Sequence, residues 1–170
     1  KGEIYAFDLH DSKLSLIKTN AERLGLSLIS VARRDARDPD PNLIGKADRV
    51  LCDVPCSGLG VMAKKPELRH KDLSESARLP AIQADILEAS ARYVKEGGVL
   101  VYSTCTILPA ENQDVVTAFL KKHPEFIAED FIIPARDPAV ASIMSYKGMV
   151  TLLPHRHGTD GFFIAKLKKI

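Results

Sequence analysis

A short apolar run that ends in an acid and a thiol constrains the fold of this chain more than any other feature. Residues 51–60 read Leu-Cys-Asp-Val-Pro-Cys-Ser-Gly-Leu-Gly, a strand that leads into a turn rich in proline and glycine. Proline fixes a backbone angle, and glycine lets the chain approach a ligand closely. In an open α/β sheet, ligands bind outside the carboxyl ends of the strands. We therefore expect Asp53 and Cys56 to project into a crevice at that edge.

A second apolar run repeats this plan. Residues 99–102 form a predicted buried strand, and Ser103, Thr104 and Cys105 follow it directly. Because the carboxyl ends of parallel strands meet at one edge of a sheet, we expect Cys56 and Cys105 to lie on the same rim. The sequence thus predicts a site that contains two thiols and one carboxylate.

Strands and helices alternate along most of the chain. This alternation is typical of a parallel sheet, because two parallel strands need a crossover between them. The predicted strands are residues 3–7, 28–32, 50–53 and 99–102. The predicted helices begin near Asp11 or Ser12 and end at Gly25, include residues 82–93 before the glycines at 97–98, and extend from Pro109 to about residue 123.

The last third of the chain has a different pattern. Apolar runs at 149–153 and 161–167 predict an antiparallel pair of strands that closes the sheet edge. Residues 126–147 carry a weak pattern, which fits a short strand or helix with a loop. The whole chain, 1–170, is expected to form a single domain, because 170 residues suffice for one sizeable core but not for two.

The composition limits the cellular context. No apolar run approaches the length needed to cross a bilayer, so we expect no membrane contact. Three cysteines without zinc-type spacing indicate reduced thiols, no metal site and a cytoplasmic protein. A net charge of +2 permits contact with nucleic acid without requiring it. Nothing in the sequence indicates an obligate protein partner.

Two thiols and a carboxylate on one rim fit methylation of a pyrimidine carbon. Carbon 5 of cytosine is a poor nucleophile until a group adds to carbon 6, and a cysteine thiolate is suited to that addition. An acid such as Asp53 would protonate or hydrogen-bond the ring nitrogen N3, a contribution of about 10²- to 10⁴-fold in rate. The C5 proton must then leave and the first thiol be expelled, which a second thiol would assist.

The sequence resembles the catalytic domain of the Sun/Fmu-type RNA cytosine-5 methyltransferases. The Pro-Cys and Thr-Cys motifs are highly specific when they occur together in this order. The motifs that carry the resemblance are Asp8, Asp35, residues 53–60, the stretch from Gly97 to Cys105, Glu111 with Asn112, and residues 154–163. The resemblance implies a Rossmann-like class I methyltransferase fold, an α/β fold whose sheet is mostly parallel with an antiparallel edge strand.

The resemblance also implies a cofactor, a substrate and residue roles. The cofactor is S-adenosylmethionine, and the partner is RNA, ribosomal RNA in preference to transfer RNA. By the same resemblance, Cys105 attacks the base and Cys56 helps to release the product. Asp8 holds the ribose hydroxyls, Asp35 the adenine amino group, and Asp53 the methionine end of the cofactor or the target base.

The chain departs from the family pattern in one respect. The first strand and the glycine-rich loop that holds the methionine part of the cofactor would precede residue 1, and no such loop occurs elsewhere. By family topology that strand lies between the strands ending at Asp8 and Asp53. The family's N-terminal RNA-binding extension is absent too. We expect these 170 residues alone to bind cofactor weakly and to be inactive.

Three other functions remain open at this point. The chain is alternatively a catalytically degenerate methyltransferase fold that serves as an RNA-binding module. A thiol redox protein would use Cys56 and Cys105, although redox pairs usually lie close in sequence. DNA cytosine-5 methyltransferases also use a Pro-Cys thiol, but there that thiol attacks the base.

Several residues have a structural reading beside a functional one. Cys52 is expected only to pack in the core. Glu111 and Asn112 are equally compatible with a structural and a functional role. Two groups of charged residues are either solvated or in contact with RNA: Lys64, Lys65, Arg69 and Lys71 in one, and His155, Arg156 and His157 with Asp160 in the other.

Overall fold

The computed structural model describes residues 2–134 and 142–170. Its strands are β1 (Ile4–Asp8), β2 (Ile29–Arg33), β3 (Ala47–Asp53), β4 (Val94–Thr104), β5 (Phe126–Ala128), β6 (Ile132–Ile133), β7 (Ile143–Met144), β8 (Met149–Leu152) and β9 (Phe162–Lys169). Its α-helices are α1 (Asp11–Arg23), α2 (Leu79–Ala91), α3 (Gln113–Lys122) and α4 (Pro154–His157). Short 3-10 turns occur at Pro41–Leu43, Leu59–Val61, Pro66–His70, Glu75–Arg78 and Pro109–Glu111.

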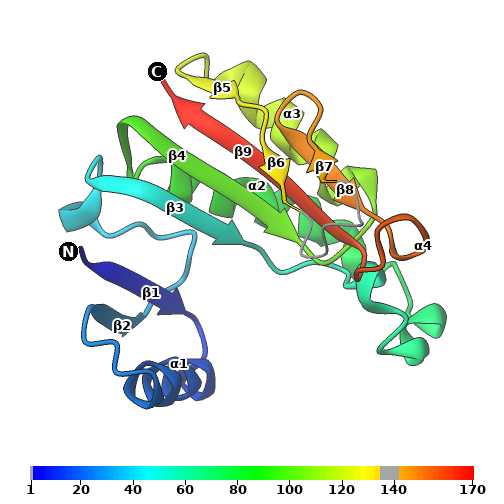
Figure 1. The fold of residues 1–170 in the computed structure, drawn as a ribbon, viewed down its shortest axis with the longest axis horizontal. Coiled ribbons are helices and arrows are strands. Elements are labelled where there is room, and N and C mark those ends of the chain that lie inside the picture. Colours follow the sequence, from blue (N-terminus) through cyan, green and yellow to red (C-terminus); the bar gives the residue numbers. More distant parts are fainter. Residues whose placement is uncertain (1, 135–141) are drawn as a thin grey trace.

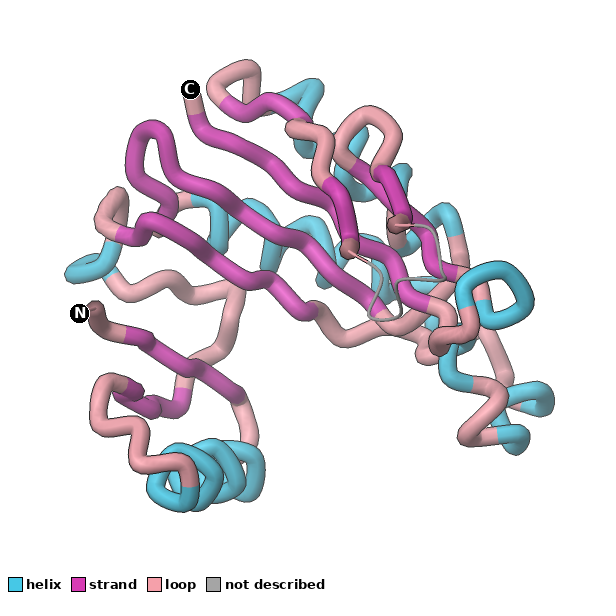
Figure 2. Tube along the Cα trace, in the orientation of Figure 1, coloured by secondary structure: helices cyan, strands magenta, loops and turns pink. Residues whose placement is uncertain are grey.

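The larger sheet has the strand order β3-β4-β9-β5, and β8 also pairs with β9 (Figure 1). β3 and β4 are parallel, whereas β9 is antiparallel to β4, β5 and β8. β1 and β2 form a separate parallel pair, and β6 and β7 a small antiparallel one. Helices α2 and α3 lie against the same face of the larger sheet (Figure 2).

The two parallel pairs of strands, β1 with β2 and β3 with β4, are not hydrogen-bonded to each other in the described part of the chain. β1 lies beside β3 in Figures 1 and 2, but within residues 2–134 and 142–170 β1 pairs with β2 alone and β3 with β4 alone. The flanking strands expose apolar side chains, with Leu51 of β3 72% exposed and Ile4 of β1 50% exposed. This arrangement agrees with the expected gap of one strand between Asp8 and Asp53.

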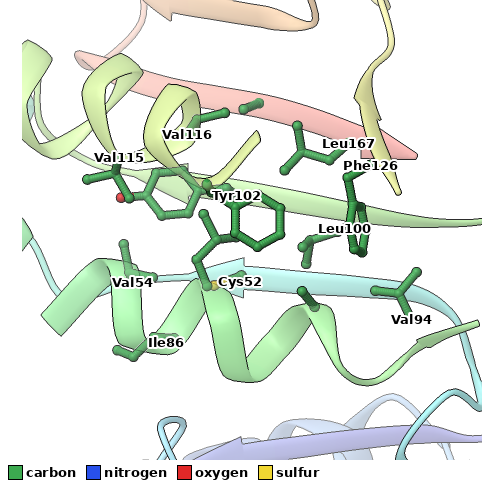
Figure 3. Close-up of a cluster of buried hydrophobic side chains, with 14 of the residues drawn as sticks. Cys52, Val54, Ile86, Val94, Leu100, Tyr102, Val115, Val116, Phe126 and Leu167 are labelled. Atoms are coloured by element: carbon green, nitrogen blue, oxygen red, sulfur yellow. The ribbon is translucent and has the colours of Figure 1, made fainter. Parts of the chain in front are cut away.

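The core fills the space between the larger sheet and its two helices (Figure 3). Alternate residues of β4 and β9, including Leu100, Tyr102, Phe163 and Leu167, are fully buried, as the two-residue period of a strand requires. Leu87 of α2 is also fully buried and belongs to the same cluster. These residues make β4 and β9 the rigid centre of the molecule.

Cys52 belongs to this core, and the prediction that it only packs there is confirmed. It is 3% exposed and lies on the sheet face that α2 covers (Figure 3). Burial disfavours its thiolate and raises the pKa of Cys52 to about 11.

Several predicted boundaries were wrong. The 149–153 and 161–167 runs do pair as the antiparallel strands β8 and β9, and the sheet edge beyond β9 is formed by β8 together with the three-residue strand β5. α2 ends at Ala91, and the glycines at 97–98 lie within β4. The residue that precedes α1 is His10, rather than Asp11 or Ser12. Pro109 opens a 3-10 turn, and helix α3 begins only at Gln113.

The 126–147 region, which had no clear sequence pattern, contains β5, β6 and β7, and residues 135–141 lie outside the described part. Among the described residues, no helix is both long enough and apolar enough to span a bilayer.

Candidate active site

Three predicted acids follow the carboxyl ends of parallel strands. Asp8 is the last residue of β1, Asp53 is the last residue of β3, and Asp35 follows the end of β2 by two residues. The Asp8 carboxylate accepts a hydrogen bond from the His10 backbone N–H at 2.9 Å. The Asp53 carboxylate accepts one from the Ser103 hydroxyl at 2.8 Å.

The Asp35 carboxylate is held by Arg37. The guanidinium donates to both carboxylate oxygens, at 3.0 and 2.7 Å, and the Arg37 backbone N–H adds a third bond at 2.9 Å. These hydrogen bonds stabilise the ionised form and lower the pKa of Asp35 to about 2. The carboxylate is therefore ionised at neutral pH.

The structure brings the two predicted thiols into contact. Cys56 lies three residues beyond β3, and Cys105 directly follows β4. β3 and β4 are adjacent parallel strands, with Asp53 opposite Ser103, so their carboxyl ends deliver both thiols to one place. The Cys56 Sγ and Cys105 Sγ atoms are 3.2 Å apart, and both residues are half-buried.

Burial and the neighbouring sulfur act together on Cys56. Desolvation disfavours its thiolate, and the hydrogen bond with Cys105 adds to that effect, which raises the pKa of Cys56 to about 12. Cys56 therefore keeps its proton near neutral pH, and its thiolate is disfavoured in this geometry.

Two glycines allow close backbone contact between the thiol turns and the segment before β9. The Gly60 N–H donates to the Cys105 carbonyl at 2.9 Å, and the Gly161 N–H donates to the Gly60 carbonyl at 2.8 Å. A Cβ atom on Gly60 would lie 1.9 Å from the Gly161 carbonyl oxygen. The backbones of the two thiol turns and of the segment before β9 can approach this closely only because both positions are glycine.

A buried polar network joins the two turns. Glu111 and Asn112 are 1% and 0% exposed, and both hydrogen-bond residues next to the cysteines. The Ser57 and Thr106 hydroxyls contact each other at 2.7 Å. Gln83 of α2, which is 0% exposed, completes the network. Sequence reasoning missed Gln83, although a glutamine three and four residues before the buried Ile86 and Leu87 was a usable signal.

The charged residues near the site were predicted to be either solvated or in contact with RNA. The Lys71 ammonium donates to the Ser57 carbonyl at 2.8 Å, and Lys64 pairs with Asp160, so each has a partner within the chain. His155, Arg156 and His157 lie in the single turn of α4, within the connection between the antiparallel strands β8 and β9. No group of three or more potential metal ligands occurs in the described parts of the chain.

Comparison with known sequences gives a consistent result. A family model described as 16S rRNA methyltransferase RsmB/F matches residues 1–168. The chain is 43% identical over 171 residues to the probable ribosomal RNA small subunit methyltransferase B of Bacillus subtilis, which covers 99% of the chain and 38% of that protein. It is 38% identical to the ribosomal RNA small subunit methyltransferase B of Thermus thermophilus, covering 99% of the chain and 40% of that protein. The chain thus spans about two fifths of the length of these relatives.

Solved structures are similar over the same extent. The structure of NSun6 from Pyrococcus horikoshii with SFG superposes with a TM-score of 0.81 at 34% identity, covering 99% of this chain and 42% of that one. A SAM-dependent O-methyltransferase from Thermotoga maritima gives a TM-score of 0.53 at 16% identity, covering 99% of this chain and 50% of that one, a likeness of fold alone. The predicted Rossmann-like class I methyltransferase fold is confirmed.

Proposed function

Because the chain belongs to the 16S rRNA methyltransferase RsmB/F family, we propose that it contributes the catalytic thiols of an enzyme that methylates carbon 5 of a cytosine in ribosomal RNA. Two kinds of support are available. The curated relatives are named as ribosomal RNA small subunit methyltransferases. NSun6 was solved with SFG, an analogue of S-adenosylmethionine, which supports S-adenosylmethionine as the methyl donor.

The acids fit such a cofactor chemically. Carboxylates accept hydrogen bonds from ribose hydroxyls and from an amino group, and Asp8, Asp35 and Asp53 follow the carboxyl ends of parallel strands, where ligands of such folds bind. We assign Asp8 to the ribose, Asp35 to the adenine amino group, and Asp53 to the methionine end or the target base. When bound, the cofactor supplies an electrophilic methyl group. To bind the adenine amino group, the Asp35 carboxylate must either accept a further hydrogen bond beside those from Arg37 or give up a bond to Arg37.

The first chemical step is addition of a thiolate to the base. The Cys105 sulfur bonds to C6 of cytosine, and the electrons of the C5–C6 double bond move into the ring. Asp53, close in sequence to the thiol turn, stabilises that charge by a proton or a hydrogen bond at N3. A bound cofactor would supply the methyl group that C5 takes, and the electrons of the broken S–CH3 bond would stay on the cofactor sulfur. Cys56, whose thiolate is disfavoured by burial, is assigned to release rather than to the attack on C6.

The second step restores the ring. The C5 proton leaves, its bonding electrons re-form the C5–C6 double bond, and the C6–S bond breaks with its electrons returning to Cys105. The Cys56 thiol, 3.2 Å from the Cys105 sulfur, can protonate that departing sulfur, and its thiolate can then accept the C5 proton. The two sulfurs together carry one proton before this step and two after it, the second being the proton lost from C5, and a proton held at N3 returns to Asp53.

The sulfur contact is the observation that carries this proposal. Two thiols 3.2 Å apart can both reach one pyrimidine ring, and they are delivered by separate strands. A degenerate fold that only binds RNA has no need of this pair on a glycine-lined rim. We regard the RNA-binding module as the alternative function.

The test uses the full-length protein and RNA that contains 5-fluorocytosine, whose fluorine prevents release. Cys105→Ser should abolish the covalent protein–RNA adduct. Cys56→Ser should still attack, and it should accumulate adduct on ordinary cytosine because release stalls. Adduct formation by Cys105→Ser would assign the attack to Cys56, as in DNA cytosine-5 methyltransferases. RNA binding without any adduct in the wild type would favour the binding module.

We also propose that residues 1–170 alone bind S-adenosylmethionine weakly and are inactive. The support is that β1, which ends at Asp8, and β3, which ends at Asp53, are not hydrogen-bonded to each other in the described part of the chain. Calorimetry should detect no micromolar affinity in this chain. Micromolar binding would contradict the proposal.

A further inference from the structure

Glu111 and Asn112 occupy the junction between a 3-10 turn and α3. The junction is fixed from the core, because the hydroxyl of the fully buried Tyr102 donates to the Glu111 carbonyl at 2.6 Å. Both side chains extend from this fixed backbone toward the thiol turns, and neither has a role in the chemistry described above.

The Glu111 side chain holds the turn that carries Cys56. Its Oε2 accepts from the Ser57 N–H at 2.9 Å and from the Gln83 side-chain amide at 2.8 Å. The same Gln83 amide nitrogen donates to the Pro55 carbonyl at 2.9 Å. The residues before and after Cys56 are therefore both tied to the Glu111 and Gln83 pair.

The Asn112 side chain holds the turn that carries Cys105 in the same way. Its Oδ1 accepts from the Thr104 hydroxyl at 2.6 Å, and its amide nitrogen donates to the Thr106 carbonyl at 3.0 Å. The residues before and after Cys105 are therefore both tied to one asparagine.

Burying this polar network costs free energy that an apolar core would not. Burying a carboxyl group is unfavourable unless hydrogen bonds to its oxygens replace those that it makes to water. Glu111 Oε1 and Gln83 Oε1 have no hydrogen-bond partner among the described residues. An apolar side chain would fill the same space at a lower cost in free energy. These polar groups are therefore explained better by the backbone that they hold than by a contribution to stability.

We propose that Glu111 and Asn112 are positioning residues, with Glu111 and Gln83 setting the place of Cys56 and Asn112 setting the place of Cys105. The inference rests on the roles proposed above for the two thiols. It assigns one residue of the junction to product release and its neighbour to attack on the base.

Two rates in the full-length protein separate these roles. Trapping by 5-fluorocytosine RNA reports attack and methyl transfer, and adduct accumulation on ordinary cytosine RNA reports stalled release. Glu111→Ala should leave trapping unchanged, accumulate adduct and lower turnover by about 10²-fold, the cost of a displacement of about 1 Å. Asn112→Ala should slow trapping without accumulating adduct.

Conservative and neighbouring variants serve as controls. Glu111→Gln keeps an oxygen that can accept both N–H bonds, so it should restore release. Gln113→Ala removes a side chain that bonds Thr151 at 3.1 Å rather than either turn, and both rates should stay as in the wild type. If Glu111→Ala fails to fold, Gln83→Ala tests the same support and should show the same stalled release.

Three results would overturn the proposal. They are equal slowing of trapping and release by both alanine variants, a Glu111→Gln defect as large as that of Glu111→Ala, and normal release in Glu111→Ala. If wild type and Cys56→Ser behave as proposed above, each of these results rejects the positioning roles of Glu111 and Asn112 and leaves the proposed roles of the thiols intact. Absence of trapping in the wild type would instead reject the thiol roles themselves.

Discussion

The N-terminal unit of β1, α1 and β2 and the layer formed by the larger sheet with α2 and α3 are built in opposite ways. Among residues 2–46, only Leu14 and Ala21 are buried. The layer contains a continuous core, in which several side chains are completely inaccessible to solvent. The acids assigned to the cofactor are divided between the two regions, whereas both thiols belong to the layer.

This difference shows in the range of the contacts. Asp8 and Asp35 bond to residues two positions away, so their surroundings are local. Cys56 contacts a residue 49 positions away, and Ser57 bonds to one 54 positions away. Asp8 and Asp35 are thus placed by short turns, whereas Cys56 and Cys105 are placed by the tertiary fold.

The largest effect should come from Gly60→Ala. A methyl group there would overlap the Gly161 backbone, and backbone atoms cannot move aside cheaply. Displacement of both thiol turns should lower turnover of the full-length protein by at least about 10²-fold. Adduct trapping measures this loss, and Gly2→Ala controls for a general effect of alanine, because an added Cβ there has no atom within 4 Å and the backbone is not left-handed. Normal trapping in Gly60→Ala would break the claim that the layer sets the thiols.

A matched pair of leucines tests the packing contrast directly. Leu87→Ala in the layer should lower the free energy of unfolding by about 2–5 kcal/mol, because it leaves a cavity among fully buried neighbours. Leu14→Ala in the N-terminal unit should cost less, about 1–2 kcal/mol, because its surroundings are open. Urea denaturation followed by circular dichroism measures both. Equal losses would mean that the two regions are packed alike.

His123 gives the layer a pH dependence. Burial lowers its pKa, but hydrogen bonds and ion pairs with Glu125 and Glu88 outweigh that effect, so the folded pKa is raised. The contribution to stability is therefore complete below the unfolded pKa of about 6.5, and it is lost as pH rises through the folded value. We expect about 1 kcal/mol at these partly exposed groups. His123→Gln should remove this step from the pH dependence of thermal unfolding, and an unchanged profile would count against it.

The smallest effect concerns Asp35 and should be confined to its own turn. Arg37→Ala removes the two guanidinium hydrogen bonds but keeps the one from the backbone N–H, so the pKa of Asp35 should rise from about 2 part of the way toward its ordinary value of about 3.9. Carbon-13 NMR titration of the carboxyl group measures the change. A pKa that stays near 2 would show that contacts other than the local turn hold this acid.

Much of the fold could be predicted because its signals are local. The strands that end at Asp8 and Asp53, the helix stop at Gly25 and the pairing of β8 with β9 all follow from runs of apolar residues and from turn residues. The place of β5 could not, because three residues carry no periodicity and only the β9 edge defines them as a strand.

The site shows the same division. Its two turns could be read from residues 53–60 and 97–105, yet the 3.2 Å sulfur contact depends on the register of β3 against β4. The support from Gln83 was missed, because a polar residue in a helix is ordinarily assigned to the solvent face, although its spacing before Ile86 and Leu87 places it on the buried face of α2. Roles for Asp8, Asp35, Asp53, Cys56 and Cys105 stay predictions.

The central place of β9 has a consequence for how the protein is made. β9 lies between β4 and β5 but follows both in the sequence. A ribosome therefore releases β4 and β5 before the strand that joins them, and each carries an unpaired edge during that interval. Gly161 is translated in the same late segment, so a nascent chain cannot close its thiol turns until translation has passed this point. Slow elongation over residues 129–161 would prolong the exposure of those edges to aggregation.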